Sequence, residues 1–318
     1  MVKNRRVGRS ETKMTVIQFL HPGGEVPVHS NPVPWNMGSR HYRRLLRHDG
    51  KYVDDANTVR DGDLCFWNEY EAPTNPTAIT QPPTGWDFAH HYHRIIQPRN
   101  LAPLPQPNGD GECCSNTDPC VFGTTFKYSN CQQVPNGDLW NLLPGSLILF
   151  GALHSNLFYL DTVFVTQNQG TQYSVPVAQH GLQLQVSTEY RRVTLDNLMP
   201  RRNNRNNTLI SDFMFYRGKL PHRTTNGTVV DDNDIFSFTP SRIFNSHQYN
   251  ERYKIDLAAL NQVIQPQVPA SRQFSVALTQ GHKGIVLNAT QYDVETIWRE
   301  IRNDVIRRSF VLGFNFDW

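Results

Sequence analysis

The chain has 318 residues, of which 38% are hydrophobic and 19% are charged, and its formal net charge is +3. This composition excludes a disordered chain, and the length provides one large core or two ordinary domains. A net charge this small does not by itself indicate a nucleic-acid protein, and no apolar run reaches the length of a membrane span. We therefore expect a globular cytoplasmic protein with no membrane partner, and the sequence leaves its oligomeric state open.

The N-terminal third begins with a polar, basic segment, residues 1–13, which predicts a flexible arm. Thr15–Leu20 then predicts a first strand. In His41–Arg47 the apolar residues recur at helical spacing, which predicts a short amphipathic helix. Its arginines, Arg43, Arg44 and Arg47, are expected to point outward.

A second strand is predicted at Leu64–Trp67, after a turn at Asp61–Asp63, and it ends in Glu69 and Glu71. These two glutamates are two residues apart, so an extended chain directs both to one face. Two like charges on one face raise the pKa of one carboxyl, which suits general acid–base catalysis. The alternative is a charged edge strand that prevents aggregation.

A proline-rich connection, residues 73–107, leads to Glu112–Gln133, which holds four of the five cysteines. Within that stretch Asn116 and Asp118 can turn the backbone through their side chains. Pro119 keeps Asp118 out of the α region, which predicts an ordered polar loop running into a buried strand. Such loops commonly carry functional residues, so the sequence places a candidate site here.

Two nearly continuous apolar runs, Leu147–Phe150 and Leu157–Val165, predict a buried hairpin. Asp161 lies inside the second run. A buried carboxylate without partners is costly. Asp161 is therefore either paired with an arginine or part of the site.

The rest of the chain contains predicted strands at Asp212–Gly218 and Ile235–Arg242 and a final amphipathic helix. Thr290 and Asp293 form a capping pair before apolar residues at helical spacing. We expect a strand-rich α+β protein, with a mixed or antiparallel β core and a C-terminal amphipathic helix. The predicted division gives a β-rich domain at 14–200, which carries the site, and an α+β lobe at 201–318.

Metal binding is one hypothesis for the site. Cys113, Cys120, Cys131 and His93 supply the soft ligands that zinc prefers. Their spacing does not match the common zinc motifs, and partly buried thiols also behave as small hydrophobes. We therefore predict no cofactor, with zinc as the alternative.

Hydrolysis of an N-glycosidic bond is the hypothesis that the residue types favour. Asp118, Asn116, Glu69 and Glu71 offer groups that activate water or stabilise an oxocarbenium ion. Aromatic side chains can stack a base, and arginines can hold phosphates. The aromatic candidates are Trp67, Tyr70, Tyr92 and Tyr128, and the basic candidates are Arg43, Arg44, Arg201, Arg202 and Arg205. The expected partner is nucleic acid, preferably DNA.

Several motifs resemble an uncharacterised bacterial protein family. They are Phe-Trp-x-Glu-x-Glu from Phe66, Asn-Thr-Asp-Pro-x-Val-Phe-Gly from Asn116 and Tyr-Ser-Asn-Cys from Tyr128, followed by the Pro-Gly-Ser strand entry at Pro144. Thr117-Asp118-Pro119 is also similar to the water-activating loop of uracil-DNA glycosylases, although the flanking Gly and Tyr of that loop are absent. The second resemblance implies that Asp118 activates water.

Two further functions stay open. Tyr216-Arg217-Gly218 and the stretch Phe236–Ser241 resemble the Arg and Ser-Thr-Ser strands of NAD-dependent ADP-ribosyltransferases, whose later acidic loop has no counterpart here. A non-enzymatic reader of modified nucleic acid, built on a small β-barrel, is the other alternative. Its strand-entry turns would lie at Asp61–Leu64 and Pro144–Leu147.

Overall fold

The fold is taken from a computed structural model of the chain. It describes residues 14–21, 24–25, 33–34, 41–71, 119–129, 131–175, 185–187, 190–191, 194–195, 201–202, 209–223, 229–231, 233–244, 251–264, 268–277 and 281–316. The predicted arm at residues 1–13 lies outside these ranges. No helix in the described part of the chain is long and apolar enough to cross a membrane.

A five-stranded mixed sheet forms the centre of the molecule, with the strand order β14-β8-β7-β1-β15. Strand β1 runs parallel to β7, and the other neighbours are antiparallel. The strands are β1 (Met14–Leu20), β7 (Leu147–His154), β8 (Leu157–Val165), β14 (Lys254–Ile255) and β15 (Gly281–Ala289). The predicted first strand and the predicted buried hairpin are confirmed, because each apolar run is buried over most of its length.

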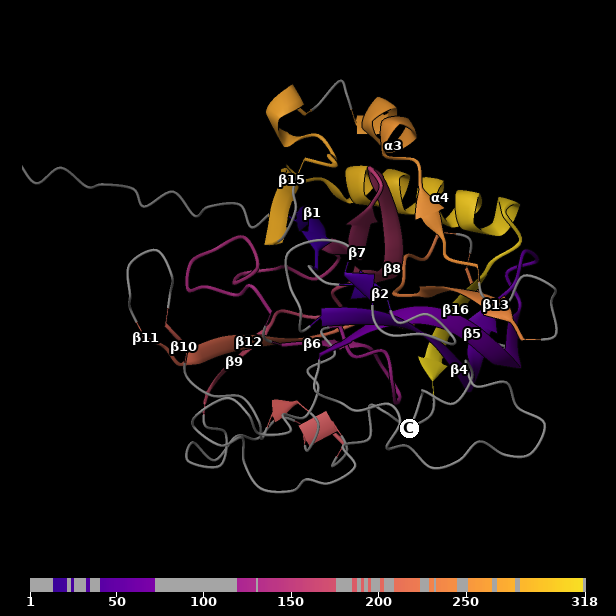
Figure 1. Ribbon diagram of the computed structural model, residues 1–318, viewed down its shortest axis with the longest axis horizontal. Helices are drawn as coiled ribbons and strands as arrows, with labels where there is room; N and C mark the ends of the chain where they lie inside the picture. Colours follow the sequence, from indigo (N-terminus) through magenta and orange to yellow (C-terminus); the bar gives the residue numbers. More distant parts are fainter. Residues whose placement is uncertain are drawn as a thin grey trace, which may run out of the picture.

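A second sheet has the strand order β16-β13-β5-β4-β2-β3, and β16 also pairs with β4. The extra pairing closes β4, β5, β13 and β16 into a ring of four strands, two of which, β4 and β5, appear as the long indigo and violet strands of Figure 1. Aromatic side chains pack together here, with 4.1 Å between the ring centroids of Phe66 and Phe316. The strands are β2 (Gly24–Glu25), β3 (Val33–Pro34), β4 (His41–Val53), β5 (Val59–Glu71), β13 (Thr239–Ile243) and β16 (Val311–Phe316).

The predicted helix at residues 41–47 is wrong, because this segment is the first half of strand β4. Its consecutive leucines are both buried, but on opposite faces of the sheet. Leu46 belongs to the main core, whereas Leu45 packs with Cys65 and Trp67 in a separate small cluster. A strand that is buried on both faces does not alternate apolar and polar residues. The apolar residues of this strand therefore matched the spacing of a helix by coincidence.

The predicted turn at Asp61–Asp63 is also wrong, because these residues lie inside β5. The chain turns earlier, at residues 54–58, where the Asp54 carboxylate accepts hydrogen bonds from the backbone N–H groups of Ala56 and Thr58. Asn57 adopts a φ of +55°, a conformation that asparagine tolerates better than most residues. The observed turn is stabilised by an aspartate side chain and needs no glycine. The Asp-Gly pair at Asp61 and Gly62 therefore predicted a turn at the wrong place.

Two smaller sheets complete the β structure, one with the order β6-β12-β9 and one of β10 and β11. The strands are β6 (Lys127–Tyr128), β9 (Thr171–Ser174), β10 (Arg201–Arg202), β11 (Leu209–Ile210) and β12 (Asp212–Arg217). The strand predicted at Asp212–Gly218 is confirmed as β12. The one predicted at Ile235–Arg242 is confirmed only in its second half, as β13.

Three helices lie late in the sequence. They are α3 (Leu257–Ile264), the 3-10 helix η5 (Ala270–Arg272) and α4 (Gln291–Arg307). Thr290 and Asp293 form the predicted capping box at the start of α4. Trp298 is buried, and its indole N–H donates to the Phe236 carbonyl at 2.8 Å.

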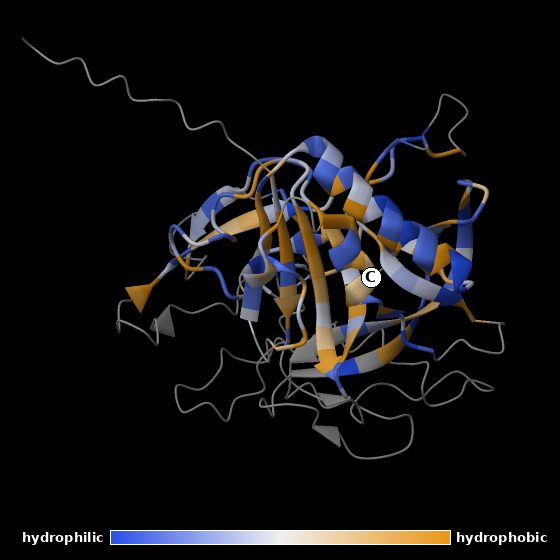
Figure 2. Ribbon diagram, turned by 90° about the horizontal axis from the view of Figure 1, so that it is seen from above, coloured by the Kyte–Doolittle hydropathy of each residue, from blue (hydrophilic) through white to orange (hydrophobic). Residues whose placement is uncertain are grey.

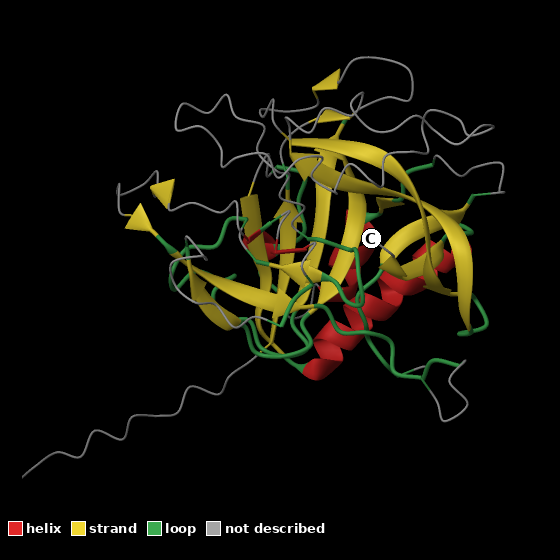
Figure 3. Ribbon diagram, turned by 90° about the horizontal axis from the view of Figure 1, so that it is seen from below, coloured by secondary structure: helices red, strands yellow, loops and turns green. Residues whose placement is uncertain are grey.

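Helix α4 packs across the sheets and contacts β1, β15 and β16. Figure 2 shows mostly hydrophobic central strands beside a helix whose outer side is hydrophilic, and Figure 3 shows the long red helix lying against the strands. The β core and the C-terminal helix confirm the predicted fold class. Strands from both sides of residue 200 share sheets, since β5 pairs with β13 and β1 pairs with β15.

Candidate functional site

Many of the predicted site residues fall outside the part of the chain whose side chains the structure describes. Those that lie wholly outside the described residues are Asn116, Asp118, Tyr92, His93, Cys113 and Arg205. For Arg44, Glu69, Tyr70, Glu71, Arg201 and Arg202 the structure describes the backbone alone. The expected joint role of Asp118, Asn116, Glu69 and Glu71 in catalysis therefore stays a prediction.

The backbone of Glu69 and Glu71 lies at the end of β5 and pairs with β4. Glu71 is opposite His41, and Glu69 is opposite Arg43. Directly opposite residues of an antiparallel pair are the closest neighbours across a sheet. The two carboxylates proposed from the sequence thus belong to the strand end that adjoins Arg43.

Arg43 does not point into solvent, and the predicted exposure of this residue is wrong. Its side chain is completely buried, and its Nε donates to Oδ2 of Asp161 at 3.2 Å. The partner belongs to β8, in the other large sheet, so this contact links the two sheets. Of the two alternatives for Asp161, pairing with an arginine is the one that the structure shows.

A second guanidinium reaches the same carboxylate. Nη2 of Arg252 donates to Oδ1 of Asp161 at 3.1 Å, and the Arg252 side chain is only 7% exposed. Its guanidinium carbon lies 5.1 Å from the ring centroid of Trp67 and 4.7 Å from that of Tyr159. Arg43, Asp161, Arg252, Trp67 and Tyr159 form what we call the arginine–aromatic cluster.

Electrostatics and stacking both act in this cluster. A carboxylate in a low-dielectric interior is stable only when charged or polar partners replace its water, and Asp161 has two guanidinium partners. The guanidinium of Arg252 gains a cation–π attraction from each ring. Tyr159 is half-buried, whereas Trp67 is 8% exposed, so the cluster approaches the surface through the tyrosine.

Two other arginines of the described chain sit in comparable but separate pairs. Arg47, which is 9% exposed and not outward as predicted, donates to both oxygens of Asp63 and lies 3.3 Å from the Phe244 ring centroid. Arg242 pairs with Glu251 and lies 3.8 Å from the Phe310 centroid. Each of these guanidinium groups has an acidic partner of its own, whereas Asp161 serves two.

Tyr128 does not fit the predicted role in base stacking. It is fully buried in the main core, and its hydroxyl donates to the Cys131 carbonyl at 2.6 Å. Its ring lies 6.0 Å from that of Tyr216 and 5.3 Å from that of Phe150. A base cannot stack on a ring that protein side chains enclose, so Tyr128 is a core residue.

The segment after Pro119 is held by a buried lysine. Nζ of Lys127 donates to the carbonyls of Phe122 and Thr125, both at 2.7 Å, and the residue is 3% exposed. Burial lowers the pKa of this ammonium group. Cys120 pairs with Lys127 through two backbone hydrogen bonds of 2.8 Å. This part of the motif is therefore structural.

The described cysteines, Cys65, Cys120 and Cys131, do not assemble into a metal centre with other described residues. Cys120 is fully buried and Cys131 is partly exposed. Among the described residues, no group of three or more His, Cys, Asp or Glu side chains is arranged to hold a metal ion. Cys65 lies outside the cysteine-rich motif, and burial together with Asp63 raises the pKa of its thiol to about 12.

The stretches that resemble ADP-ribosyltransferases lie near each other, because the Ser237 backbone N–H donates at 2.8 Å to the carbonyl of Lys219, the residue after Gly218. Their hydroxyl groups, however, are buried in the protein. The Ser237 hydroxyl hydrogen-bonds the backbone of Val165, and the Ser241 hydroxyl donates to the Thr239 carbonyl. These hydroxyl groups hydrogen-bond to the protein's own backbone, so they give the ADP-ribosyltransferase hypothesis no support.

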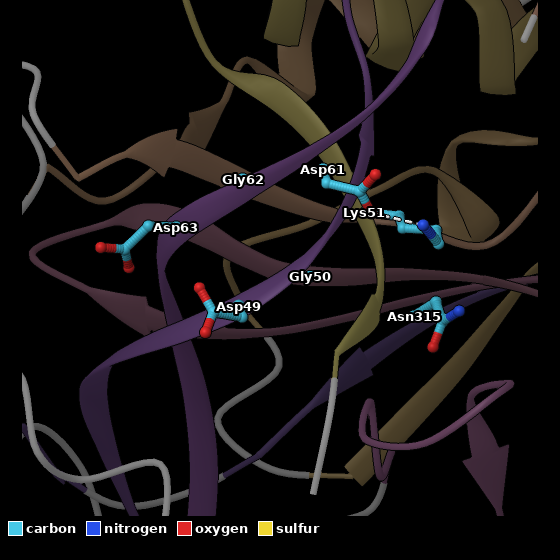
Figure 4. A pocket seen from close by; sticks show the side chains of 7 residues that line it. All are labelled: Asp49, Gly50, Lys51, Asp61, Gly62, Asp63 and Asn315. Carbon is cyan, nitrogen blue, oxygen red and sulfur yellow. Dashed lines mark hydrogen bonds and ion pairs between the residues drawn. The ribbon is translucent and has the colours of Figure 1, made fainter.

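A hollow of about 480 Å³ lies where β4 and β5 approach the end of β16. It is lined by Asp49, Gly50, Lys51, Asp61, Gly62, Asp63 and Asn315. Figure 4 shows that Lys51 is directed at Asp61, with which it forms an ion pair, while Asp49 and Asp63 lie on the other side of the two glycines. Asp63 is already bound by Arg47, so most of the acidic charge here has a protein partner.

Comparison with protein-family models, with curated proteins and with solved structures finds no match for this chain. The resemblance to a bacterial family, which rests on short motifs, therefore stays a prediction. Arg252 and Tyr159 were missed by sequence reasoning. Tyr159 looked like one more residue of an apolar strand, and Arg252 stands in no motif, so only the fold brings them to Asp161.

Proposed function

We propose that the protein binds a nucleotide or nucleic-acid base and hydrolyses its N-glycosidic bond. One observation carries the proposal. The arginine–aromatic cluster, which offers both aromatic rings and guanidinium groups, adjoins the strand end that carries Glu69 and Glu71. Aromatic rings bind bases by stacking, and guanidinium groups bind phosphate, so the two halves of a nucleotide each have a matching group.

The half-buried ring of Tyr159 is the group that a base would reach first. The guanidinium carbon of Arg252 lies 4.7 Å from the Tyr159 ring centroid and 5.1 Å from that of Trp67. An aromatic ring in such a place can also stack on a flat ligand, because every base has a π face. Recognition by stacking is tolerant of base identity, and other contacts would select the base.

Glu69 and Glu71 are the proposed acid–base pair. Cleavage of an N-glycosidic bond passes through an oxocarbenium-like transition state, which a carboxylate stabilises while another activates water. The guanidinium of Arg43, opposite Glu69 in the strand pairing, favours an ionised carboxylate in its vicinity. Asp118 is a further candidate for water activation through the sequence resemblance alone.

The test is release of base from oligonucleotides. Plain and base-modified duplexes are incubated with purified protein and then with alkali, which cleaves the strand at an abasic site. We expect cleavage with the wild-type protein and a loss of at least about a hundredfold in Glu69→Gln or Glu71→Gln, because general acid–base catalysis contributes about that much. Glu295→Gln, a change on α4, is the matched control and keeps full activity. Absence of base release from every oligonucleotide and nucleotide would refute the proposal.

A second candidate function is a non-enzymatic reader of modified nucleic acid. The closed ring of β4, β5, β13 and β16 favours it, since the reader hypothesis requires a small β-barrel. Of its two predicted strand-entry turns, only the one at Pro144–Gly145 precedes a strand, whereas Asp61–Leu64 lies within β5. Tight binding of an oligonucleotide without release of its base would favour the reader over the hydrolase.

A further inference from the structure

We propose that a small cleft between α3 and the C-terminal end of α4 binds a free α-amino acid of about the size of glycine or alanine. Helices α3 and α4 pack against each other (Figure 1), and the cleft lies between them with a volume of about 60 Å³. It shares no residue with the arginine–aromatic cluster or with the strand end of Glu69 and Glu71. The inference therefore goes beyond the proposed function.

The floor of the cleft is apolar. The side chains of Ile255, Leu260 and Ile301 line it and are buried, and Ala259 of α3 lines it with only a methyl group. A cavity of about 10–15 Å³ holds one water molecule, so this cleft holds about four to six groups of that size. The volume limits an enclosed ligand to a molecule about as large as glycine or alanine.

Two arginines form the basic side of the cleft. Asp304 forms ion pairs with Arg307 and with Arg308, the latter at 3.0 Å between Nε and Oδ2. The Tyr253 hydroxyl donates to the same carboxylate at 2.7 Å. Burial and this hydrogen bond raise the pKa of Tyr253, so its hydroxyl keeps its proton. One carboxylate therefore faces two guanidinium groups, and one positive charge remains in excess.

The N–H donors of these two arginines can be followed one by one. Arg307 uses Nη2 for Asp304, and its side chain is 69% exposed. Arg308 uses Nε for Asp304 and Nη1 for the Lys254 carbonyl at 3.1 Å. Within the described chain, Nε and Nη1 of Arg307 and Nη2 of Arg308 have no acceptor. Guanidinium groups bind carboxylates strongly, so these donors suit the carboxylate of a ligand.

Glu300 forms the acidic side of the cleft. Among the described residues its carboxylate has no hydrogen bond or ion pair. Asp256 also lines the cleft, but its Oδ1 accepts from the backbone N–H groups of Ala258 and Ala259 at 2.9 and 3.1 Å. The carboxylate of Glu300 is therefore the one in this cleft that a ligand's ammonium group would neutralise.

The two charged sides lie on one face of α4. Glu300, Asp304 and Arg308 recur at intervals of four residues, which places them on the same side of a helix. The helical rise separates Glu300 from Arg307 by about 10 Å along the axis. Two long side chains and a small ligand between them can fill that span.

An α-amino acid matches all three parts of the cleft. Its ammonium group pairs with Glu300, its carboxylate accepts from Arg307 and Arg308, and its short side chain lies on the apolar floor. A simple carboxylic acid leaves Glu300 without a partner, and an alkylamine leaves the excess positive charge without one. Charge complementarity therefore selects a zwitterion over an ion of either single charge.

The test is calorimetric titration of the full-length protein with glycine and alanine. Acetate, propionate, methylamine and ethylamine are the matched ligands of single charge. We expect the better amino acid to bind at least about tenfold more tightly than its matched acid or amine, because a charge-assisted hydrogen bond contributes about that much. Glu300→Gln should weaken amino-acid binding about tenfold and leave the affinity for the carboxylic acid unchanged. Arg307→Gln, at an exposed position, should also weaken amino-acid binding about tenfold.

Glu295→Gln is the matched control, because Glu295 also lies on α4 but pairs with Arg299 and does not line the cleft. It should leave the affinity unchanged, whereas Ala259→Leu, which fills the floor, should abolish binding. No binding of glycine or alanine, equal affinity for the amino acid and its matched ions, or an unchanged affinity in Glu300→Gln would overturn the inference. If Ala259→Leu fails to fold, Glu300→Gln and Arg307→Gln decide, since neither side chain is buried.

Discussion

Replacing Asp161 with asparagine should destabilise the protein strongly, because it leaves two buried guanidinium groups beside a neutral amide. Asparagine keeps the shape of the side chain but removes the charge, and it puts an NH₂ donor where one carboxylate oxygen accepted a hydrogen bond. Arg43 is fully buried, and the Asp161 side chain is 5% exposed, so water cannot replace the lost charge. Removing one partner of a buried ion pair costs about 3–5 kcal/mol.

The matched control is Asp63→Asn, which removes the acid from the Arg47 pair. The Asp63 side chain is 34% exposed, so solvent can reach the vacated contact, and its loss should cost about 1 kcal/mol or less. Urea denaturation followed by circular dichroism gives both free energies of unfolding. Folded domains have a free energy of unfolding of only about 5–15 kcal/mol, so a loss of this size in the Asp161→Asn variant should strongly lower the urea concentration at the denaturation midpoint. A loss below about 1 kcal/mol, or one equal to that of Asp63→Asn, would refute the reasoning about the cluster.

Two further predictions concern the fold. Thr290→Ala removes the hydroxyl that accepts a hydrogen bond from the Asp293 N–H, so it should lower the free energy of unfolding by about 1 kcal/mol. Thr290→Ser keeps a hydroxyl and should change this free energy little. Equal losses for the two variants in urea denaturation would contradict the capping role. For Cys65, burial raises the pKa of the thiol from 9.0 to about 12, so the folded protein keeps its proton after the unfolded chain has lost it. Burial of the protonated Cys65 thiol therefore stabilises the folded protein fully below pH 9, and this stabilisation declines as the pH rises toward 12. The stability advantage of the wild-type protein over Cys65→Ala should shrink as denaturation is repeated from pH 8 to pH 10.5, and a constant advantage would contradict this.

The parts of the fold that the sequence predicted are those that local chemistry specifies. The apolar runs on either side of residues 155–156 specify a hairpin, and Thr290 with Asp293 specifies the start of α4. Strand β4 was mistaken for a helix because Leu45 and Leu46 are buried in two different clusters. The second cluster exists only through tertiary packing, which no local pattern contains.

The sequence predicted the carboxylates of the candidate site, Trp67 and Arg43, although it placed Arg43 at the surface. Asp161 was recognised as a buried charge that needs a partner, yet its partners are 118 and 91 residues away in the sequence. Nothing in the spacing of Arg43 or Arg252 distinguishes them from surface arginines. Their burial follows from the pairing of β4 with β5 and from the position of residue 253, whose carbonyl accepts from the Leu160 N–H at 3.0 Å.

The most direct test of the proposed function is chromatographic measurement of free base after incubation of the purified protein with each deoxynucleoside 5′-monophosphate and with duplex oligonucleotides. The proposed function predicts free base from at least one of these substrates, and loss of the product in Glu69→Gln and in Glu71→Gln. The absence of free base from every substrate, while the protein is folded, would contradict the proposed function.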